Sequence, residues 1–455
     1  MLEPIESTRL ASPATSRGSM REVVTLAYPV VLSTLTASAT HVIDSAFVGR
    51  LGATELAAVG YGGIWIWTAL TLFMGTASGV QTFVSQCDGA GRREQCGGWA
   101  WQGFYALAPL TIAGTGLFVW ALPSLLGALG PSPALQHHAY AYVSWRALGA
   151  LGLVTLMVLS AFFRGLGDTR TPLVAAVISM LVNVTLDYGL IFGELGLPAW
   201  GVAGAGAATA VAEWTGAVVL LVAFRRPTLT PYRTATVPAD ATEIRRFLRT
   251  SLPIGGQWAV EMSSFALFST LVARMGDAAM AASQVLIALL SLSFMQAIGI
   301  SMASATLVGR YIGARDFASA EQSHRTSMVL GFALAAGIAG LLMGAPDWLL
   351  SVFTDDPEVV RLGRPLIVLG GIFQAFDAMQ IIVGGSLRGA GDTRWPFLTQ
   401  SALAWGFMLP LAYLISITLG HGLMGAWWAC TAYVLVLALV LLQRFRSGSW
   451  RTIEI

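Results

Sequence analysis

The sequence predicts an all-α integral membrane protein with twelve transmembrane helices arranged as two pseudo-symmetric six-helix bundles. The composition is the first observation behind this prediction, because 55% of the residues are hydrophobic, only 11% are charged and the mean hydropathy is +0.69. A soluble protein carries about twice that share of charged residues. The second observation is an internal repeat, since residues 164–172 recur as residues 388–396 at an offset of 224 residues.

Many other residues are identical at positions separated by the same offset. Pro29 corresponds to Pro253 and Arg50 to Arg274, so the chain is two copies of one unit. Because each unit has an even number of predicted spans, both units enter the membrane from the same side as parallel repeats. We expect the two halves to face each other across a cleft near the membrane midplane and to expose it alternately to either side.

Each predicted span is an apolar stretch of about 20 residues or more, long enough to cross a hydrocarbon core about 30 Å thick as a helix. The spans are 23–49, 56–86, 98–122, 140–163, 171–193, 201–224, 250–273, 280–309, 325–345, 363–387, 395–418 and 422–443. The domains expected from them are a cytoplasmic tail (1–22), an N-terminal six-helix bundle (23–224), a cytoplasmic linker (225–249), a C-terminal six-helix bundle (250–445) and a cytoplasmic tail (446–455).

The arginines set the predicted orientation. All 26 basic residues are Arg, and most lie in the N-terminal tail, the even-to-odd loops, the linker and the C-terminal tail. The positive-inside rule therefore places both termini and the linker in the cytoplasm, and the basic loops indicate topology rather than nucleic-acid binding. Residues 1–20 lack a signal-peptide pattern, so we expect an uncleaved multi-pass protein of a bacterial-type plasma (inner) membrane.

Prolines mark several predicted boundaries. Ser132-Pro133 and Asp356-Pro357 are each typical of a helix N-cap followed by Pro at the first helical position, and each predicts a short external helix. Asp240 predicts the cap of a short amphipathic helix in the linker. Pro29 and Pro253 fall inside the first span of each half, where a proline removes a backbone hydrogen bond and kinks the helix, so they are candidate hinges.

Carboxylates inside the predicted spans are the strongest functional signal. A charge at mid-membrane costs roughly 2.5 to 3.5 kcal/mol on insertion scales, so each one requires a reason. The five such residues are Asp44, Asp187, Glu213, Glu261 and Asp377. Since no arginine within a span is placed to neutralise them, apart from Arg146 near an outer edge, we expect the carboxylates to bind protons, metal ions or a cationic substrate.

The N-terminal carboxylates have polar neighbours at helical spacing. Asn183 and Asp187 are four residues apart, as are Thr209 and Glu213, and His41 lies three residues before Asp44. Carboxylate, amide and hydroxyl oxygens suit a sodium ion, whereas a buried carboxyl group suits a proton. Glu213 is a possible additional site residue, and each acid has a structural alternative as a protonated group bonded to a neighbouring helix.

The C-terminal carboxylates are not copies of the N-terminal ones. Glu261 and Asp377 correspond in the repeat to Ala37 and Leu153, and Gln257 lies one turn before Glu261. Each half therefore has its own predicted site, with H⁺ or Na⁺ as the coupling ion and no other cofactor. The candidate sodium ligands are Asp44, Asn183, Asp187 and Thr209 in one half, or Glu261 and Asp377 in the other.

The sequence resembles a known family over nearly its whole length. The two six-span halves, the loops 164–172 and 388–396 and the segment 42–52 are similar to the multidrug and toxic compound extrusion (MATE) family of cation-coupled antiporters. Glu261, placed eight residues after Pro253, and the segment 376–380 resemble the NorM-like branch. The resemblance implies that Glu261 and Asp377 bind the coupling ion and contribute to recognition of cationic drugs.

The resemblance also implies an N-terminal ion site. Asp44 matches the family's first-span aspartate, Asn183 and Asp187 its fifth-span pair, and Thr209 its sixth-span hydroxyl. There are two departures from the family pattern. Phe373 stands where an aromatic hydroxyl is expected one turn before Asp377, and His41 adds a titratable group near Asp44. Both departures favour protons over sodium without deciding between them.

The implied function is secondary active efflux of organic cations or amphipathic toxic compounds, which would confer antibiotic resistance on a cell. The nearest alternative is a lipid-linked precursor flippase of the same superfamily, which is expected to have cationic residues in its cavity and two extra spans. An intramembrane enzyme is disfavoured because the sequence has no lysine for a Walker or Schiff-base site, no H-E-x-x-H motif and no clear G-x-S-x-G elbow. A passive channel remains a third alternative. We expect a monomer in the lipid bilayer, with small organic cations as partners.

Overall fold

The computed structural model describes residues 17–129, 132–453 and 455, and over these residues it is built of helices and their connections. The first half contains α1 (Met20–Gly49), α2 (Ala53–Ser78), α3 (Val80–Gly89), α4 (Arg93–Leu129), α5 (Pro133–Ala147), α6 (Ala150–Gly165), α7 (Arg170–Phe192) and α8 (Val202–Phe224). The second contains α9 (Ala241–Ala273), α10 (Asp277–Gly313), α11 (Phe317–Gly344), α12 (Pro346–Ser351), α13 (Pro357–Gly389), α14 (Arg394–Leu403), α15 (Leu409–Tyr413) and α16 (Gly422–Arg446). Residues 1–16 of the predicted N-terminal tail lie outside the described residues.

Each predicted span coincides with one long helix or with consecutive helical segments. Ten helices in the described residues are long and apolar enough to cross a membrane, and α5 with α6 form an eleventh candidate bent by 47°. The remaining predicted span, 250–273, lies within α9, whose first turns carry three arginines. The segment 394–418 is also irregular, because two π-helical turns, Ala404–Met408 and Leu414–Thr418, flank α15.

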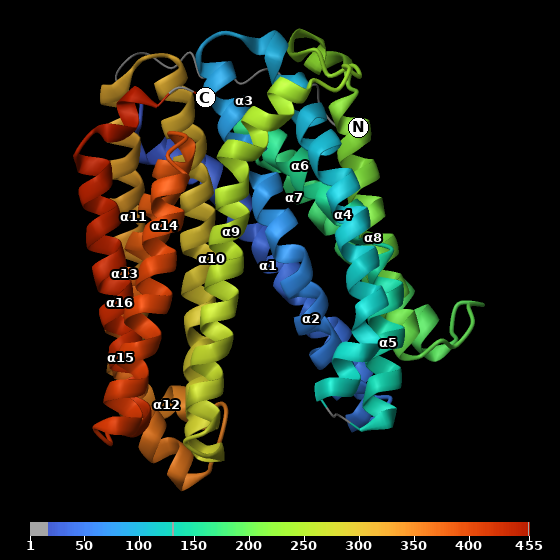
Figure 1. Cartoon of the computed structure of the whole chain (residues 1–455), viewed down its shortest axis with the longest axis vertical. Helices are drawn as coiled ribbons and strands as arrows, with labels where there is room; N and C mark the ends of the chain where they lie inside the picture. Colours follow the sequence, from blue (N-terminus) through green and yellow to red (C-terminus); the bar gives the residue numbers. More distant parts are fainter. Residues whose placement is uncertain (1–16, 130–131, 454) are drawn as a thin grey trace. The chain divides into compact units, whose positions relative to one another are not determined.

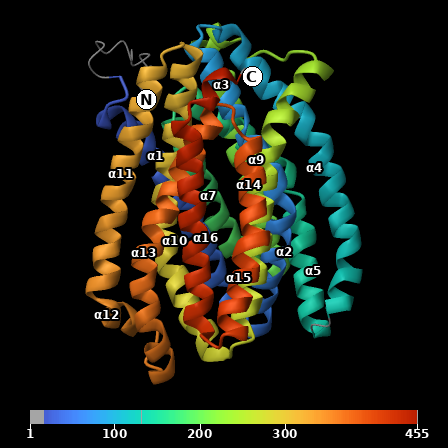
Figure 2. The same ribbon diagram turned by 60° about the vertical axis from the view of Figure 1, so that its left-hand side comes forward.

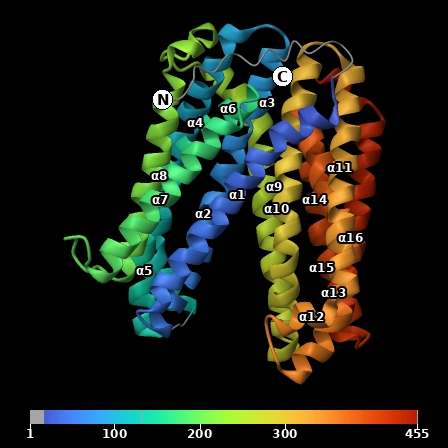
Figure 3. The same ribbon diagram turned by 180° about the vertical axis from the view of Figure 1, so that it is seen from behind.

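The helices fall into two compact units. One unit is Leu32–Gly255, in which α7 packs along α8 and α4 along α6 (Figure 3). The other is Gly256–Ile455 with the segment that ends at Val31, and in it α10, α13 and α16 lie side by side (Figure 1) while α15 packs on α16 (Figure 2). Both α1 and α9 are therefore divided between units, each two residues after its internal proline, at repeat-equivalent positions.

The repeated loop motif has the same backbone geometry in both halves. Gly167 and Gly391 adopt positive φ angles of 82° and 85°, a conformation that favours glycine. In each loop the next residue returns a hydrogen bond to the end of the preceding helix, from the Asp168 amide to the Phe163 carbonyl (2.9 Å) and from the Asp392 amide to the Leu387 carbonyl (2.9 Å). The repetition in sequence thus encodes a repeated helix C-terminal turn.

The predicted caps before α5 and α13 are confirmed. The Ser132 side chain accepts a hydrogen bond from the Leu135 amide (3.3 Å), and Asp356 accepts one from the Glu358 amide (2.8 Å). Each cap begins a helix that leads into the next predicted span, as expected, but neither helix is short and external: α5 forms a bent span candidate with α6, and α13 runs unbroken through the next predicted span. The break after α5 lies at Gly149, whose repeat equivalent, Phe373, is inside the continuous α13.

The linker is more ordered than the expected short surface helix. Asp240 does cap a helix, accepting a hydrogen bond from the Thr242 amide (2.7 Å), but this helix is the start of α9 and continues into the next predicted span. Its Phe247 is fully buried against Phe83. Ahead of the cap, Gln102 of α4 donates to the Pro238 carbonyl (2.9 Å) and accepts from the Asp240 amide (3.0 Å). The sequence predicted only a short amphipathic surface helix here, because the residues that order the linker, Phe83 and Gln102, are far away in the chain.

The N-cap of α11 is Asp316, a carboxylate that lies outside the predicted spans and has a lowered pKa. Asp316 accepts hydrogen bonds from the Ser319 hydroxyl (2.7 Å) and amide (3.1 Å) and pairs with Arg17 (3.2 Å). The Ser319 hydroxyl, its amide and the Arg17 charge together hold the pKa of Asp316 below its usual range.

We therefore expect Asp316→Ala to lower the free energy of unfolding by about 1 kcal/mol at neutral pH, through loss of the cap. Because the folded-state pKa of Asp316 is depressed, its ionic contribution is present above the unfolded pKa of about 3.9 and is lost as the pH falls through the folded value. Asp316→Asn, the control, keeps most of the cap and loses the pH dependence. Thermal unfolding of detergent-purified protein between pH 7 and pH 3 measures this, and equal stability of all three proteins would contradict it.

Close helix packing at the loop motif generates a second prediction. A side chain at Gly389 would place its Cβ 2.3 Å from the Ala305 carbonyl oxygen and 2.8 Å from the Ala305 Cα, both backbone atoms that cannot rotate away. Gly389→Ala should lower the free energy of unfolding by about 1–3 kcal/mol through overpacking. Gly384→Ala in the same helix meets nothing within 4 Å and is the matched control, expected to be neutral or stabilising in thermal unfolding. Equal losses in the two variants would show that the close approach is not responsible.

Candidate functional site

Two helices of the N-terminal unit, α1 and α7, bring the predicted N-terminal acids together. Asp44 of α1 is 9% exposed, and Asn183 and Asp187, one turn apart on α7, are almost fully buried. The carboxyl groups of Asp44 and Asp187 lie within hydrogen-bonding reach of each other. The structure therefore places side by side two acids that are 143 residues apart in the sequence.

The polar atoms of this cluster have no protein partners. Among the described residues, Asp44 Oδ1, both carboxyl oxygens of Asp187 and both polar side-chain atoms of Asn183 are buried without a hydrogen bond. Two ionised carboxylates are acceptors only, so their mutual approach satisfies neither. Buried polar groups are normally bonded, and leaving one unpaired costs about 1–3 kcal/mol. A proton or a cation between the carboxyl groups would satisfy these acceptors.

The other predicted N-terminal residues surround this pair less closely. Thr209 of α8 is half-buried, and its hydroxyl donates to the Ala205 carbonyl (2.9 Å) of its own helix. His41 is exposed, yet it is close enough to Asp44 for an electrostatic interaction. Tyr142 of α5, which the sequence analysis did not single out, is buried within electrostatic reach of Asp44 and Asp187.

Glu213 differs from the other intramembrane acids because it forms a direct ion pair with a protein cation. Arg146 Nη1 lies 2.5 Å from Glu213 Oε2, and both side chains are about one-tenth exposed. Gly149 makes room for this pair, since a Cβ there would lie 2.4 Å from Glu213 Oε2. Of the five acids that the sequence analysis left without a neutralising partner, Glu213 has one in direct contact.

The C-terminal unit also brings its two predicted acids together. Glu261 of α9 and Asp377 of α13 are half-buried and lie within electrostatic reach of each other. Asp377 accepts a hydrogen bond from the Gln380 side chain (3.1 Å). Gln257, one turn before Glu261, is buried and donates to the Gln400 side-chain oxygen on α14.

A cation from the repeated loop lies near this second pair. Arg388, the first residue of the second loop motif, interacts electrostatically with Glu261 and donates to the Ser301 hydroxyl (3.0 Å). The sequence shows Arg388 as part of a repeated loop and gives no sign that it is a neighbour of Glu261.

Gln400 and Tyr433 are site residues that sequence reasoning missed. Gln400 is 2% exposed and Tyr433 of α16 is 8% exposed, and both lie near Glu261. A Gln or a Tyr inside an apolar span is visible in the sequence, but the sequence does not show which side chain it contacts. An intramembrane Gln or Tyr is a weaker functional signal than a carboxylate, because it costs less to bury than a charge.

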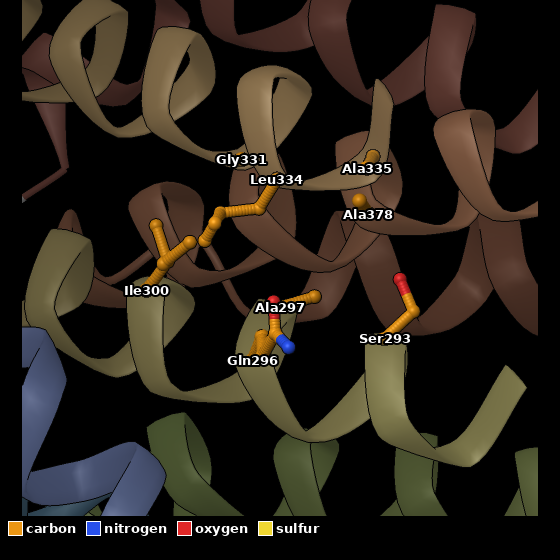
Figure 4. Close-up of a pocket in the computed structure, with 8 residues that line it drawn as sticks. All are labelled: Ser293, Gln296, Ala297, Ile300, Gly331, Leu334, Ala335 and Ala378. Atoms are coloured by element: carbon orange, nitrogen blue, oxygen red, sulfur yellow. The ribbon is translucent and has the colours of Figure 1, made fainter. Parts of the chain in front are cut away.

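A cavity lies among α10, α11 and α13 of the same unit (Figure 4). Ser293, Gln296, Ala335 and Ala378 are among the residues that line it, and its volume is about 10 Å³. This volume holds about one water molecule, whereas pockets for small organic ligands are about 300–1,000 Å³. The cavity is therefore too small for an organic cation.

Neither acidic cluster is a dense metal centre. In the part of the chain that the structure describes, no group of three or more His, Cys, Asp or Glu side chains is placed to hold a metal ion. A sodium ion at either cluster would have to use amide, hydroxyl or backbone oxygens together with the two carboxylates.

Two repeated helical units, each with a pair of acids inside apolar helices, are typical of a membrane transport protein. The comparison with protein families agrees with the repeat. The MatE family model matches residues 29–189 and again residues 253–414, so its two matches begin 224 residues apart. The chain belongs to the MatE (multidrug and toxic compound extrusion) family.

Similar proteins place the chain in the NorM-like branch. It is 29% identical to a probable multidrug resistance protein NorM of Thermotoga maritima, with 94% of this chain and 93% of the relative covered. It is 30% identical to the probable NorM of Idiomarina loihiensis, with 96% of each covered. The fold matches a crystal structure of a eukaryotic MATE transporter with a TM-score of 0.85 at 21% identity, covering 95% of this chain and 96% of that one. An outward-facing MATE family transporter gives a TM-score of 0.87 at 18% identity, covering 95% and 97%.

The Arg146–Glu213 pair generates a stability prediction. Removing one partner leaves the other charge buried alone, so Arg146→Met and Glu213→Leu should each lower the free energy of unfolding by about 3–5 kcal/mol. The double variant removes both charges and should be more stable than either single variant. Thermal unfolding of the purified proteins measures the three values. Additive losses in the double variant would mean that the two side chains do not stabilise each other.

Proposed function

We propose that this chain exports organic cations and amphipathic toxic compounds in exchange for H⁺ or Na⁺ by alternating access. The single observation that carries the proposal is the Asp44–Asp187 pair, whose buried oxygens lack partners in the described residues. Membership of the MatE family and the names of the NorM relatives support the multidrug part.

We propose the proton as the coupling ion. Two carboxyl groups within hydrogen-bonding reach cannot both ionise at low cost, and one shared proton converts two facing acceptors into a donor and an acceptor. His41 offers a titratable group close to Asp44 on the exposed side of α1. Phe373, which has no hydroxyl, weakens a sodium site beside Asp377.

The proposed cycle couples loading of these acids to release of the substrate. The outward-facing protein takes up the ion on Asp44 and Asp187, or on Glu261 and Asp377, which lowers the affinity for the bound organic cation. The ion then leaves to the cytoplasm and resets the transporter. A membrane potential supplies about 2.3 kcal/mol per charge per 100 mV, enough to drive accumulation without ATP. We accordingly propose a transporter and not an enzyme.

The C-terminal acids are proposed to recognise the cationic substrate and to take part in coupling. Glu261 and Asp377 are half-buried, so they combine negative charge with access for a ligand. Gln257 supports Glu261 from one turn away on α9. Glu213 is given no ion-binding role, because Arg146 already neutralises it.

Pro29 and Pro253 are proposed hinges. Each lies inside a helix that is divided between the two compact units, and each division comes two residues after the proline. A proline weakens the helix locally by removing one hydrogen bond. We further propose that the protein is a monomer in a bacterial-type inner membrane. The arginine distribution supports our proposal that both termini are in the cytoplasm.

Ethidium transport in proteoliposomes tests the proposed function. With an imposed proton gradient, wild-type protein should transport ethidium, and Asp44→Asn and Asp187→Asn should each abolish the gradient-dependent part, because an amide cannot carry the proton. Glu194→Gln, which changes an exposed acid in the loop after α7, is the control and should transport as wild type. Thermal unfolding of each variant separates loss of coupling from loss of fold.

Separate gradients distinguish the alternatives. Transport driven by a sodium gradient alone would overturn the proton assignment and leave the antiport intact. Ethidium transport that persists after all gradients are collapsed would indicate a passive channel. No ethidium transport under either gradient would overturn the multidrug proposal and favour the flippase of lipid-linked precursors.

A further inference from the structure

The C-terminal acidic pair lacks the hydroxyl that its own helix was expected to provide. Phe373, one turn before Asp377 on α13, packs edge-to-face against Trp427 with ring centroids 5.8 Å apart. It is used for helix packing and offers no donor. On α13 itself the Gln380 side chain donates to Asp377 (3.1 Å), and other helices of the unit bring further polar groups to the pair.

Gln400 of α14 is placed to supply one. It is 2% exposed, and the Gln257 side-chain amide donates to its oxygen. This bond occupies the Gln400 oxygen and directs the amide nitrogen, with its two N–H groups, to the other side. The Gln400 side chain is also close enough to interact with the Glu261 carboxylate and with the Tyr433 hydroxyl. The opposite orientation of the amide would set its oxygen against an acceptor-only carboxylate, which is unfavourable.

Tyr433 of α16 connects this network to the second acid. It is 8% exposed and lies within electrostatic reach of both Glu261 and Asp377. Cys430, three residues earlier and on the same side of α16, is near Asp377. A buried phenol normally finds a partner for its hydroxyl, and the groups around it here are Gln400 and the two acids.

We propose that Gln400 is a positioning residue for Glu261, anchored by Gln257, and that Tyr433 supplies from α16 the hydroxyl that Phe373 lacks. This inference rests on the proposed function, because it assumes that Glu261 and Asp377 take part in coupled transport. Gln400 orients the carboxylate and stabilises its ionised form through a charge-assisted hydrogen bond. The other groups that face Glu261 are Arg388 and Asp377 of α13.

The network also ties three helices of the C-terminal unit to one carboxylate. Gln257 and Glu261 stand on α9, Gln400 on α14 and Tyr433 on α16. The Gln257–Gln400 bond fixes the amide that faces Glu261. Loss of that bond therefore has the same consequence as loss of the Gln400 amide, which makes the two substitutions non-additive.

The test is the pH dependence of proton-driven ethidium transport in proteoliposomes. Gln400→Met, which keeps the length of the side chain, should move the pH midpoint of transport upward by about one pH unit, because the carboxylate loses a donor to its ionised form. Gln257→Met should move it in the same direction, and the double variant should shift it no further than the larger single shift. Tyr433→Phe, which removes only the hydroxyl, should also shift the midpoint.

Gln374→Met is the matched control. Gln374 is likewise a buried glutamine of this unit, but it donates to the Ala335 carbonyl and not to a carboxylate. Its substitution should lower thermal stability and leave the pH midpoint unchanged. This separates positioning of Glu261 from the general effect of losing a buried hydrogen bond.

Glu261→Gln separates this inference from the proposed function. If Glu261→Gln abolishes coupled transport while Gln400→Met and Tyr433→Phe keep the wild-type pH midpoint, the positioning role is wrong and the proposed function stands. If Glu261→Gln transports as wild type, the C-terminal site itself is wrong and the inference falls with it. Equal midpoint shifts in Gln374→Met and Gln400→Met would also overturn the positioning role.

Discussion

The burial of carboxyl groups inside apolar helices is the constraint on which the rest of this structure depends. An ionised acid in a low-dielectric span is costly unless something compensates it, and the chain does so in three ways. Arg146 neutralises Glu213 directly. Glu261 has the Arg388 charge and amide donors nearby. Asp44 and Asp187 lie near each other with oxygens that have no hydrogen bond among the described residues, and we propose that an ion compensates them there. Direct contact with Arg146 thus distinguishes Glu213 from the acids that we propose for transport.

The same constraint explains where glycine is required. The Arg146–Glu213 pair fits only because Gly149 has no side chain, and Phe373 at the equivalent point of the other half accompanies an unbroken helix. The two halves thus share loops, turns and span order, while each carries a different set of charges. We propose that this difference in interior chemistry lets one half of the duplicated scaffold hold the coupling ion while the other recognises a cation.

Much of the fold was predictable from the sequence, because its signals are local. Apolar stretches longer than the membrane is thick marked the spans, and all twelve coincide with helices or consecutive helical segments. The caps at Ser132, Asp356 and Asp240 followed from their side chains. The linker helix and the two external helices were expected to be short, but each continues into the next predicted span, because a cap marks where a helix begins and not how far it continues. The approximate location of the Asp44 and Glu261 sites was also accessible, since a charge in an apolar span is visible without a structure.

The sequence by itself determined the number and order of the helices, the duplication and the identity of the buried acids. Only the tertiary structure decided which side chains meet: Glu213 with Arg146, Asp44 with Asp187, and Glu261 with Gln400 and Tyr433. The physical reason is that helices apolar on nearly every face carry little periodicity to show which side turns inward. Their rotation is set by close packing of small residues and by the need to satisfy buried polar groups, and both depend on residues far away in the chain.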